Sequence, residues 1–369
     1  MADLRCEVLI IGGGVVGLAL ARALSLRGRD VALVELQSRC GMATSSRHSE
    51  VIHAGIYYPT GSLKAETCIE GRRALYRYLD SQGIQYQKIS KLIFASQPSE
   101  VATLEALYRQ GIRNGVEGLS LVGGAELRDL EPELKAERAI LSKETGIFDS
   151  HAYLRALEVD AREAGAHIAI GTRFESAMRD GADWNVSLNT SGERTTLNAR
   201  WLVNCAGHGA HAVAKTIEGY PSELLPPRFL ARGSYWATTQ KVPFKRLIYP
   251  MPSEGGLGIH LTFDLAGAAR FGPDVEWVGK EDYAVDPTRQ AYFEDAVRRY
   301  FPGLETERLR PDYAGIRPKI VGPNESSADF MLQGFEDHGV EKLLNLFGLE
   351  SPGLTASLAL AERVALRMH

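Results

Sequence analysis

Short apolar runs alternate with amphipathic stretches along most of the chain. Two runs, residues 8–11 and 31–34, have the length and composition of buried strands, and the residues between them, up to Gly28, follow a helical pattern. Buried strands separated by a helix are typical of a parallel sheet. Further strands are expected at 84–88, 91–95, 167–170 and 201–205, and helices at 62–81, 98–114 and 151–164. The pattern therefore predicts an α/β fold.

Between residues 221 and 318 the sequence pattern changes to short predicted strands that are rich in aromatic residues and follow one another along the chain. Strands are expected at 235–236, 247–249, 257–263 and 268–271, with a helix at 288–300. Such a succession favours an antiparallel sheet. The α/β pattern then resumes, with strands expected at 329–333 and 343–347 followed by a last helix. We expect two discontinuous domains, one from residues 1–83, 147–219 and 318–369, and the other from residues 84–146 and 220–317.

Three glycines, Gly12, Gly14 and Gly17, lie between the first strand and the first helix, and Glu35 ends the second strand. This is the spacing of a dinucleotide-binding turn. The first glycine permits a tight turn, the second lets backbone approach a pyrophosphate, and the third lets the helix pack on the strand. The helix N-terminus offers N–H groups to the phosphates, and Glu35 can accept hydrogen bonds from ribose hydroxyls. A nucleotide cofactor is favoured over an α/β core without a ligand.

Composition narrows the class of protein further. The 369 residues suffice for two cores, and a net charge of −4 without a basic block argues against nucleic acid as a partner. The four cysteines include no Cys-x-x-Cys pair, which indicates reduced thiols in a cytoplasmic protein. The uncharged run at 8–21 is interpreted as the strand and helix described above, not as a signal peptide. Because it is too short to span a bilayer, any membrane contact would be peripheral, on the inner face.

Three motifs together make the chain similar to a known superfamily. They are the glycine turn, the Ser/Thr-rich loop at 41–49, and the sequence Ser-Pro-Gly-Leu-Thr at 351–355. The chain resembles FAD-dependent oxidoreductases of the D-amino-acid-oxidase type, and residues 51–58, 61–65, 256–262 and 315–319 resemble the L-2-hydroxyglutarate dehydrogenase branch. Glu50 stands where that branch favours glycine, and Ser234 where it favours an acid. The resemblance implies a Rossmann-like, glutathione-reductase-like FAD-binding domain and a second α+β substrate domain built on an antiparallel sheet.

The resemblance also implies that FAD is bound non-covalently, without a metal. The polar loop would contact the cofactor, although a solvated loop is the alternative. Backbone N–H groups at the start of the last helix could stabilise reduced flavin, although a simple proline turn would explain the same residues. The end of the strand at 201–205 resembles a second glycine turn. The expected FAD-binding residues are Gly12, Gly14, Val15, Val16, Gly17, Glu35, Thr44, Ser45, Ser46, His48, Ala206, Gly207, Gly353, Leu354 and Thr355.

The chemistry implied by the resemblance is oxidation of an alcohol beside a carboxylate, with hydride transfer to flavin N5 and transfer of the hydroxyl proton to a base. Histidine suits that base because its pKa lies near neutrality. His53 and His260 lie in branch-specific motifs. We favour His260 as the base and place His53 beside the flavin, although either could be a hydrogen-bonded structural residue. Whether His53 and Tyr57 share a face depends on the local conformation, which the sequence leaves open.

The substrate carboxylate is expected to bind Arg317, because a guanidinium can bind it through two hydrogen bonds; the alternative is a salt bridge between domains. Lys64, Tyr57, Tyr58 and Tyr249 could bind a second carboxylate or a hydroxyl, or could be an ordinary helix residue and core aromatics. We therefore expect an FAD-dependent 2-hydroxy acid dehydrogenase or oxidase that converts L-2-hydroxyglutarate to 2-oxoglutarate and passes electrons to an acceptor such as quinone or oxygen. The alternatives are a flavin amine or amino-acid oxidase, similar to glycine or sarcosine oxidase, and a non-catalytic flavoprotein.

Overall fold

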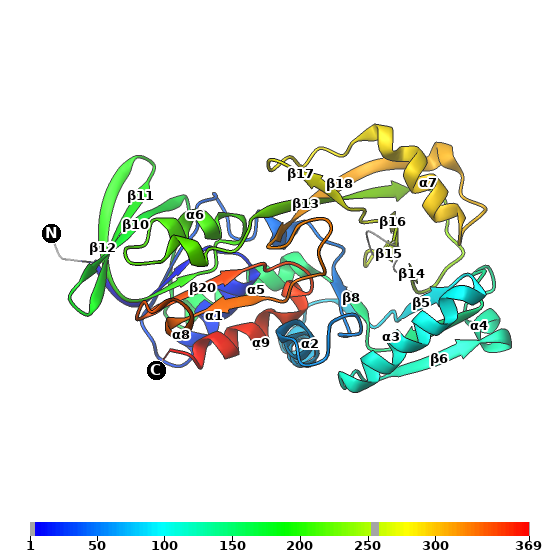
Figure 1. Cartoon of the computed structure of the whole chain (residues 1–369), viewed down its shortest axis with the longest axis horizontal. Coiled ribbons are helices and arrows are strands. Elements are labelled where there is room, and N and C mark those ends of the chain that lie inside the picture. The colour runs from blue at the N-terminus through cyan, green and yellow to red at the C-terminus, as the bar shows by residue number, and fades with distance from the viewer. Residues whose placement is uncertain (1–3, 252–257, 369) are drawn as a thin grey trace.

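The computed structural model describes residues 4–251 and 258–368. Figure 1 shows one sheet, which includes β12 (Glu193–Asn204) and β20 (Leu343–Phe347), at the end of the molecule where both termini lie. A second sheet occupies the opposite end. The long strands β13 (Phe229–Thr238) and β18 (Leu309–Lys319) pair along their lengths and lead from the region of the first sheet into the second (Figure 1). The molecule therefore consists of two sheet-based regions joined by this strand pair.

The first sheet has a parallel centre that is buried on both faces. Val8, Leu9 and Ile10 of β1 are completely buried, which explains the uninterrupted apolar run in the sequence. An antiparallel meander of β10, β11 and β12 extends one side, and β19 pairs with β20. The strands are β1 (Leu4–Ile11), β2 (Val31–Val34), β9 (His167–Ala169), β10 (Thr172–Asp180), β11 (Asp183–Thr190), β12 (Glu193–Asn204), β19 (Met331–Gln333) and β20 (Leu343–Phe347).

Two helices of this region, α2 and α5, begin within one residue of the predicted starts. Ser62 caps α2, since its Oγ accepts a hydrogen bond from the Ala65 N–H at 3.1 Å. Asp149 caps α5 in the same way, accepting from the Ala152 N–H at 2.7 Å. α1 packs against α5 and α9, and α2 packs against α9. The helices of this region are α1 (Val15–Ser25), α2 (Leu63–Gln82), α5 (Ser150–Glu163), α6 (Ala210–Lys215), α8 (Phe335–His338) and α9 (Gly353–Ala365).

The second sheet is largely antiparallel, as predicted, in the order β17-β13-β16-β15-β14-β5-β7-β6. One pair is parallel: β5 runs in the same direction as β14, with Lys91 opposite Leu247. The sheet thus combines strands from residues 84–146 with strands from residues 220–317. The exact boundaries of the two predicted domains stay a prediction. The strands not yet given are β5 (Lys91–Ala95), β6 (Leu119–Gly123), β7 (Arg138–Ser142), β14 (Leu247–Pro250), β15 (Leu261–Phe263), β16 (Ala269–Phe271) and β17 (Glu276–Val278).

Smaller elements complete the fold. Helices α3 and α4 pack on β6 and β7, and Phe293 of α7 packs on Trp236 of β13. A three-stranded sheet has the order β3-β8-β4. These elements are α3 (Val101–Arg113), α4 (Gly124–Leu130), α7 (Gln290–Arg298), β3 (Val51–Ile52), β4 (Tyr86–Gln87) and β8 (Gly146–Phe148).

Several predicted bounds are corrected by local geometry. The strand expected at 84–88 is only β4, because the Ile84 N–H bonds to the Leu79 carbonyl as part of the end of α2. The helix expected at 98–114 starts with a 3-10 turn, Pro98–Glu100, and that expected at 288–300 is α7, preceded by another such turn. The strand expected at 257–263 starts only at residue 261, since Gly258 has φ +76°, a conformation outside the β region. Residue 257 itself lies outside the described residues.

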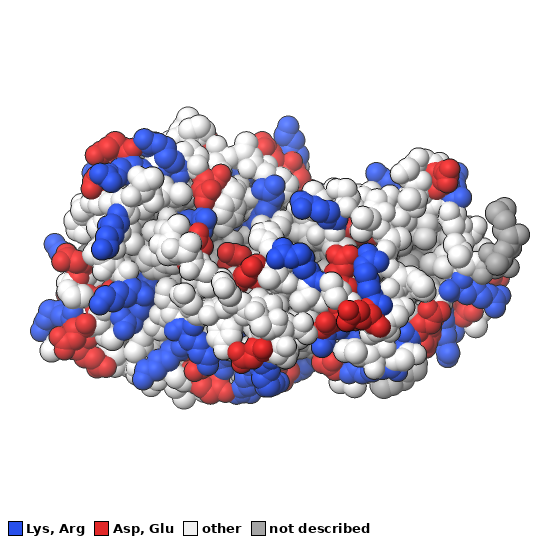
Figure 2. All heavy atoms as spheres, turned by 180° about the vertical axis from the view of Figure 1, so that it is seen from behind, with Lys and Arg blue, Asp and Glu red and all other residues white. Residues whose placement is uncertain are grey.

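Charged side chains of both signs are interspersed on the face seen from behind in Figure 2, and neither sign dominates it. This agrees with the nearly balanced composition of 42 Lys+Arg and 46 Asp+Glu. Among the helices that the structure describes, none is long and apolar enough to cross a membrane.

Candidate active site

A cavity of about 1710 Å³ begins at the carboxyl end of the parallel strands and extends to the second sheet. In α/β folds this end of the sheet is where ligands bind. The walls come from the glycine turn after β1, the polar loop at 41–50, the end of β12, the strands β13, β14 and β18, and the loop before α9. The volume exceeds the ~300–1000 Å³ usual for one small ligand. The cavity can therefore hold a large cofactor together with a small substrate.

The glycine turn leaves no room for a larger residue. Gly12 has φ +108°, and a Cβ at this position would lie 2.6 Å from the carbonyl oxygen of Cys205. A Cβ on Gly17 would lie 2.0 Å from the Gly12 carbonyl oxygen, so Gly17 allows α1 to pack on β1 and does not line the cavity. Gly14 and the first residues of α1, Val15 and Val16, do line it. The N-terminus of α1 therefore faces the cavity.

Glu35 also lies in the cavity wall, and two backbone groups hold its carboxylate. Its Oε2 accepts a hydrogen bond from the Gly13 N–H at 2.6 Å, and its Oε1 accepts one from the Gln37 N–H at 2.7 Å. A carboxylate oxygen can accept more than one hydrogen bond. Glu35 is thus positioned next to the glycine turn and can still accept bonds from hydroxyls of a ligand.

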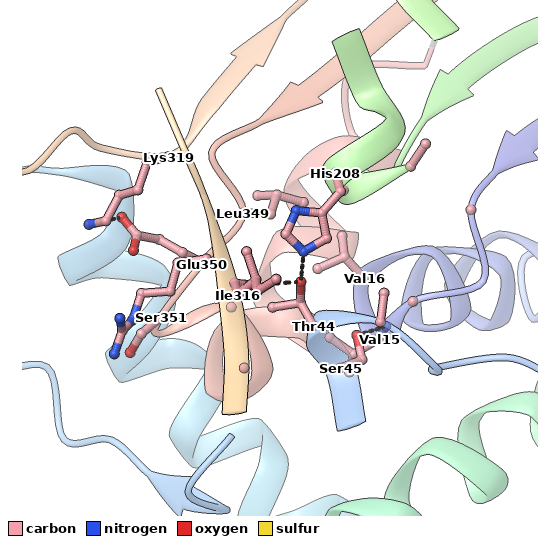
Figure 3. Close-up of a pocket in the computed structure, with 18 of the residues that line it drawn as sticks. Val15, Val16, Thr44, Ser45, His208, Ile316, Lys319, Leu349, Glu350 and Ser351 are labelled. Atoms are coloured by element: carbon pink, nitrogen blue, oxygen red, sulfur yellow. Dashed lines mark hydrogen bonds and ion pairs between the residues drawn. The ribbon is translucent and has the colours of Figure 1, made fainter. Parts of the chain in front are cut away.

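The polar loop contributes most, but not all, of its predicted residues to the cavity. Ser45 Oγ accepts the Val15 N–H of α1 at 3.0 Å. Thr44 Oγ1 lies 2.9 Å from His208 Nε2 and donates to the Ile316 carbonyl at 3.3 Å, as Figure 3 shows. His48 lines the cavity, and burial lowers the pKa of its imidazole. Ser46 instead donates its hydroxyl to the Met42 and Ala43 carbonyls and does not line the cavity.

His208 is a cavity residue that sequence reasoning missed. It follows the second glycine turn, where Ala206 and Gly207 also line the cavity. Its Nδ1 is buried without a hydrogen-bond partner among the described residues. Burial lowers the pKa of the imidazole, which favours the neutral ring. Its position directly after a predicted cofactor turn was a sequence signal that could have identified it.

Glu50, the departure from the expected glycine, has φ +54°. This left-handed conformation costs glycine little and other residues more, which accounts for the preference for glycine at such a position. The Glu50 Oε1 accepts a hydrogen bond from Ser150 Oγ at 2.6 Å. The carboxylate therefore ties the polar loop to the start of α5.

The first two residues of α9, Gly353 and Leu354, lie in the cavity wall, whereas Thr355 does not line the cavity. The Thr355 Oγ1 accepts the His53 N–H at 3.1 Å and donates to the Val51 carbonyl at 3.4 Å. Thr355 therefore connects α9 to the segment that carries His53. Its side chain is completely buried, so its contribution to the cavity is to fix the position of that histidine.

Lys64 lines the cavity, but its ammonium group is bound within the protein. The Glu350 Oε1 accepts bonds from Lys64 Nζ at 3.2 Å and Lys319 Nζ at 2.9 Å. Figure 3 shows Lys319 and Glu350 side by side across β18 from His208. Burial alone would raise the pKa of Glu350, but the two lysines lower it below its usual value. The three side chains together keep a net positive charge.

His53 lies in the irregular segment between β3 and α2, so it shares no helical face with Tyr57. This settles the relation that the sequence left open. The His53 Nε2 is 3.3 Å from Ser351 Oγ, and the ring lines the cavity. Burial, followed by the positive charge of Lys91, lowers the pKa of His53 to about 3. The imidazole is therefore neutral at physiological pH.

His260 enters the same cavity from the second sheet, just before β15. It is buried, and its ring stacks on that of Tyr249 with centroids 3.6 Å apart and an interplanar angle of 12°. The backbone is fixed as well, because the His260 carbonyl accepts the Gly272 N–H at 2.9 Å. The two histidines singled out from the sequence thus face one cavity from different sheets.

Arg317 lies on β18 and lines the cavity. Its Nη1 donates to the Asp274 carbonyl at 3.3 Å, and a Cβ on the adjacent Gly233 would lie 2.9 Å from its Nη2. Gly233 therefore lets the guanidinium lie directly on the backbone of β13. Most of the five N–H donors of Arg317 are left for other partners.

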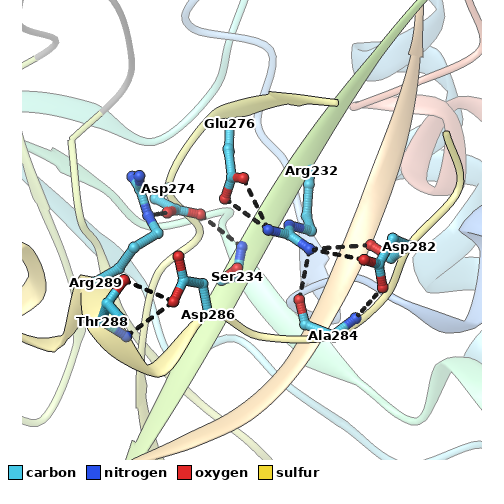
Figure 4. Close-up of polar contacts among 9 residues, drawn as sticks. All are labelled: Arg232, Ser234, Asp274, Glu276, Asp282, Ala284, Asp286, Thr288 and Arg289. Carbon is cyan, nitrogen blue, oxygen red and sulfur yellow. Dashed lines mark hydrogen bonds and ion pairs between the residues drawn. The ribbon is translucent and has the colours of Figure 1, made fainter. Parts of the chain in front are cut away.

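The backbone that supports Arg317 is held by a buried carboxylate. Asp274 Oδ1 accepts the Ser234 N–H at 2.7 Å, and its Oδ2 pairs with Arg289 Nε at 2.7 Å, as Figure 4 shows. Beside it, the Arg232 Nη2 donates to both carboxylate oxygens of Glu276, at 2.8 and 2.9 Å. An acid was expected at position 234, and Asp274 brings a carboxylate to Ser234 from another segment.

Tyr57, Tyr58 and Tyr249 all line the cavity, and burial raises the pKa of each hydroxyl. A second residue that sequence reasoning missed lies next to two of these rings. The Lys91 Nζ is 4.9 Å from the Tyr57 ring centroid and 4.6 Å from that of Tyr249. Its position at the start of a predicted strand gave no sequence signal that it is buried.

Comparisons with known proteins agree with this geometry. The family model described as FAD dependent oxidoreductase matches residues 7–367. The mitochondrial L-2-hydroxyglutarate dehydrogenase of Arabidopsis thaliana is 41% identical, covering 99% of this chain and 84% of the relative. The corresponding enzyme of Bos taurus is 28% identical, covering 97% and 88%. The solved structure of L-alpha-glycerophosphate oxidase from Mycoplasma pneumoniae, with FAD bound, has the same fold, with a TM-score of 0.87 at 24% identity, covering 99% of this chain and 94% of that one.

Proposed function

Because the chain belongs to the family of FAD-dependent oxidoreductases, we propose that it oxidises L-2-hydroxyglutarate to 2-oxoglutarate. One arrangement supports this above all: Arg317, His53 and His260 line the same cavity as the glycine turn. A carboxylate-binding group and a proton acceptor are what oxidation of a 2-hydroxy acid requires besides the cofactor. The 41% identity to a plant enzyme of that name supports the choice of substrate.

FAD is the cofactor of this enzyme, and the residues present fit it. Gly12 lines the cavity where the first turn packs against the backbone of the second, since a Cβ on it would lie 2.6 Å from the Cys205 carbonyl oxygen. His208 Nδ1 and Arg47 Nε are buried in cavity residues without partners among the described residues, as expected where a polar ligand completes the contacts. When bound, FAD supplies the two-electron acceptor at flavin N5.

We assign the remaining cofactor roles by position. The N-terminus of α1 would bind the pyrophosphate and Glu35 the ribose. Gly17 would act through helix packing and Thr355 through His53, while Ser46 would only stabilise the loop. The cavity-lining residues proposed to contact the cofactor are Gly12, Gly14, Val15, Val16, Glu35, Thr44, Ser45, His48, Ala206, Gly207, Gly353 and Leu354.

The substrate would be held and deprotonated by residues from both sheets. Arg317 binds the carboxylate next to the hydroxyl through two parallel hydrogen bonds. A ring nitrogen of His260 takes the hydroxyl proton, and the Tyr249 ring beneath it keeps the imidazole in one orientation. His53 stays neutral and offers a hydrogen bond beside the flavin. Tyr57, Tyr58, Tyr249 and the cluster around Lys64 complete the wall around the rest of the substrate.

The test is anaerobic mixing of the purified protein with candidate substrates while flavin absorbance is recorded. L-2-hydroxyglutarate should bleach the flavin, whereas D-2-hydroxyglutarate, L-lactate, glycerol 3-phosphate, glycine and sarcosine should bleach it slowly or not at all. Bleaching by the amines alone would support an amine oxidase instead. A flavin that none of these compounds bleaches would indicate a flavoprotein without turnover.

The role of His260 separates the two enzyme classes. His260→Gln should slow reduction of the flavin by L-2-hydroxyglutarate by roughly 10²–10⁴-fold, the usual contribution of a general base. His167→Gln is the matched control, because His167 is exposed on β9 and does not line the cavity. Little change in His260→Gln would favour the amine chemistry, which needs no strong base when the amine arrives neutral.

The electron acceptor and the location are further parts of this proposal. We propose quinone or oxygen as the acceptor, to be compared by reoxidation rates of the reduced protein. The four unpaired cysteines support a reducing compartment such as the cytoplasm, with at most a peripheral membrane contact. Fractionation of cells that produce the protein would test the location.

A further inference from the structure

Lys91 is a buried cation without a counter-charge. Only 1% of the residue is exposed, and among the residues that the structure describes no carboxylate or other hydrogen-bond acceptor pairs with its Nζ. Buried lysines are normally paired, because removing an unpaired charge from water is costly. Its ammonium group lies over the faces of two tyrosine rings, and the Cys68 thiol and the His53 imidazole are near enough to interact with its charge. Such a residue requires an explanation other than stability.

The position of Lys91 relates it directly to the cavity. His260 covers one face of Tyr249 at a centroid distance of 3.6 Å, so Lys91 has to lie over the other face. Tyr57 and Tyr249 line the cavity, whereas Lys91 does not. The Lys91 ammonium group is therefore separated from the cavity by the Tyr249 ring. With the ammonium group, the Tyr249 ring and the His260 ring stacked in that order, the ammonium group is about 8 Å from the His260 ring.

We propose that Lys91 is a specificity-determining positioning residue, whose buried charge behind Tyr57 and Tyr249 favours substrates that carry a second carboxylate. This inference rests on the proposed function, because it concerns the same substrate. Arg317 can neutralise one carboxylate, and the charges of Lys64 and Lys319 are partly neutralised by Glu350. Among the residues that the structure describes, Lys91 has no such carboxylate, so a dicarboxylate ligand would supply the missing negative charge.

The expected effect follows from Coulomb's law. At an effective dielectric constant near 20, a unit charge about 8 Å away changes the affinity for an anion by roughly 30-fold, and incomplete protonation of the lysine reduces this to roughly tenfold. A ligand with a single carboxylate, bound to Arg317, has no second negative charge for Lys91 to attract. Its affinity should depend on Lys91 much less.

The experiment compares the binding of glutarate and butyrate to the FAD-loaded protein, measured as perturbation of the flavin absorption spectrum. Lys91→Met should weaken glutarate binding roughly 10- to 30-fold and butyrate binding less than about threefold. With L-2-hydroxyglutarate, KM should rise while kcat changes little. Lys88→Met is the matched control, because Lys88 is exposed, pairs with Glu144 at 2.8 Å and lies over the ring of Tyr76.

Other outcomes would overturn the inference. Equal weakening of both ligands would indicate a structural role, and unchanged glutarate binding would exclude a role in specificity. Loss of dicarboxylate preference in Lys319→Met but not in Lys91→Met would assign that preference to the Glu350 cluster. Lys91→Gln provides a second neutral side chain if the Met variant does not retain FAD. Failure of the wild-type protein to oxidise L-2-hydroxyglutarate would refute the proposed function, while the glutarate and butyrate comparison would still report on Lys91.

Discussion

Replacing Lys91 with methionine should change how the stability of the protein depends on pH. Burial lowers the pKa of Lys91 from 10.5 to about 7. Between pH 7 and 10.5 the unfolded chain therefore binds a proton that the native protein does not, and native stability rises with pH in that window. Below pH 7 both states are protonated, and the native protein carries the whole cost of the buried charge. Methionine has nearly the same length and removes this contribution.

The size of the effect follows from the shift in pKa. A difference of one proton changes the free energy of unfolding by about 1.4 kcal/mol per pH unit. From pH 7, where about half of the native lysine is already neutral, to pH 9 the wild-type protein should therefore gain about 2 kcal/mol relative to Lys91→Met. For a chain of this length that corresponds to roughly 3 °C in Tm. The methionine variant should have the higher Tm at pH 6, and its advantage should shrink as the pH rises.

Thermal unfolding of both proteins, at several pH values and a fixed excess of FAD, measures this difference. The difference in Tm between the two proteins removes the contribution of every other titratable group, because the two proteins share those groups unchanged. FAD must be held constant because a ligand that binds only the native state raises Tm by mass action. A Tm difference that is independent of pH, or one that grows with pH in favour of methionine, would refute the idea that Lys91 carries an uncompensated charge.

Three further predictions concern FAD binding, substrate binding and the ion pairs of Glu350. Gly12→Ala should abolish FAD binding, read from the absorbance ratio of flavin to protein, because its Cβ would lie 2.6 Å from the Cys205 carbonyl; Gly279→Ala, with open space around it, should retain FAD. Arg317→Lys should keep the flavin but raise KM by roughly 10- to 100-fold, since lysine cannot make the paired hydrogen bonds. Glu350→Gln should lower stability by about 3–5 kcal/mol, visible in Tm, because it leaves the buried Lys64 and the half-buried Lys319 without their carboxylate.

The elements that depend on local chemistry could be predicted from the sequence. β2, β5 and β20 have the predicted bounds, because each is a short apolar run between clear breaks. The α2 start at Ser62 is correct because a serine hydroxyl satisfies a first-turn N–H wherever the rest of the chain lies. The glycine turn is similarly local, since its conformation excludes other residues. These features require only neighbours in the chain.

The parts of the site that depend on distant segments could not be predicted. Asp274 supports Ser234 from 40 residues away along the chain, and nothing near either residue indicates the contact. Lys91 begins a strand that was correctly placed, but only the parallel pairing of β5 with β14 brings it to Tyr249. His208 is intermediate, because its place after a glycine turn was visible whereas its contact with Thr44 was not.

Two arrangements of positive charge beside the cavity have opposite consequences for stability. Lys64 and Lys319 share Glu350, so removing any member should destabilise the fold whatever ligand is bound. Lys91 has no carboxylate partner in the described part of the chain, so removing it should stabilise the empty protein and weaken only the binding of a doubly charged ligand. A residue that lowers stability and raises affinity is expected at a functional site, where the ligand supplies the missing interaction. A Lys91→Met protein that is both less stable and equally selective would show instead that the lysine stem serves only to fill the space between the two tyrosine rings.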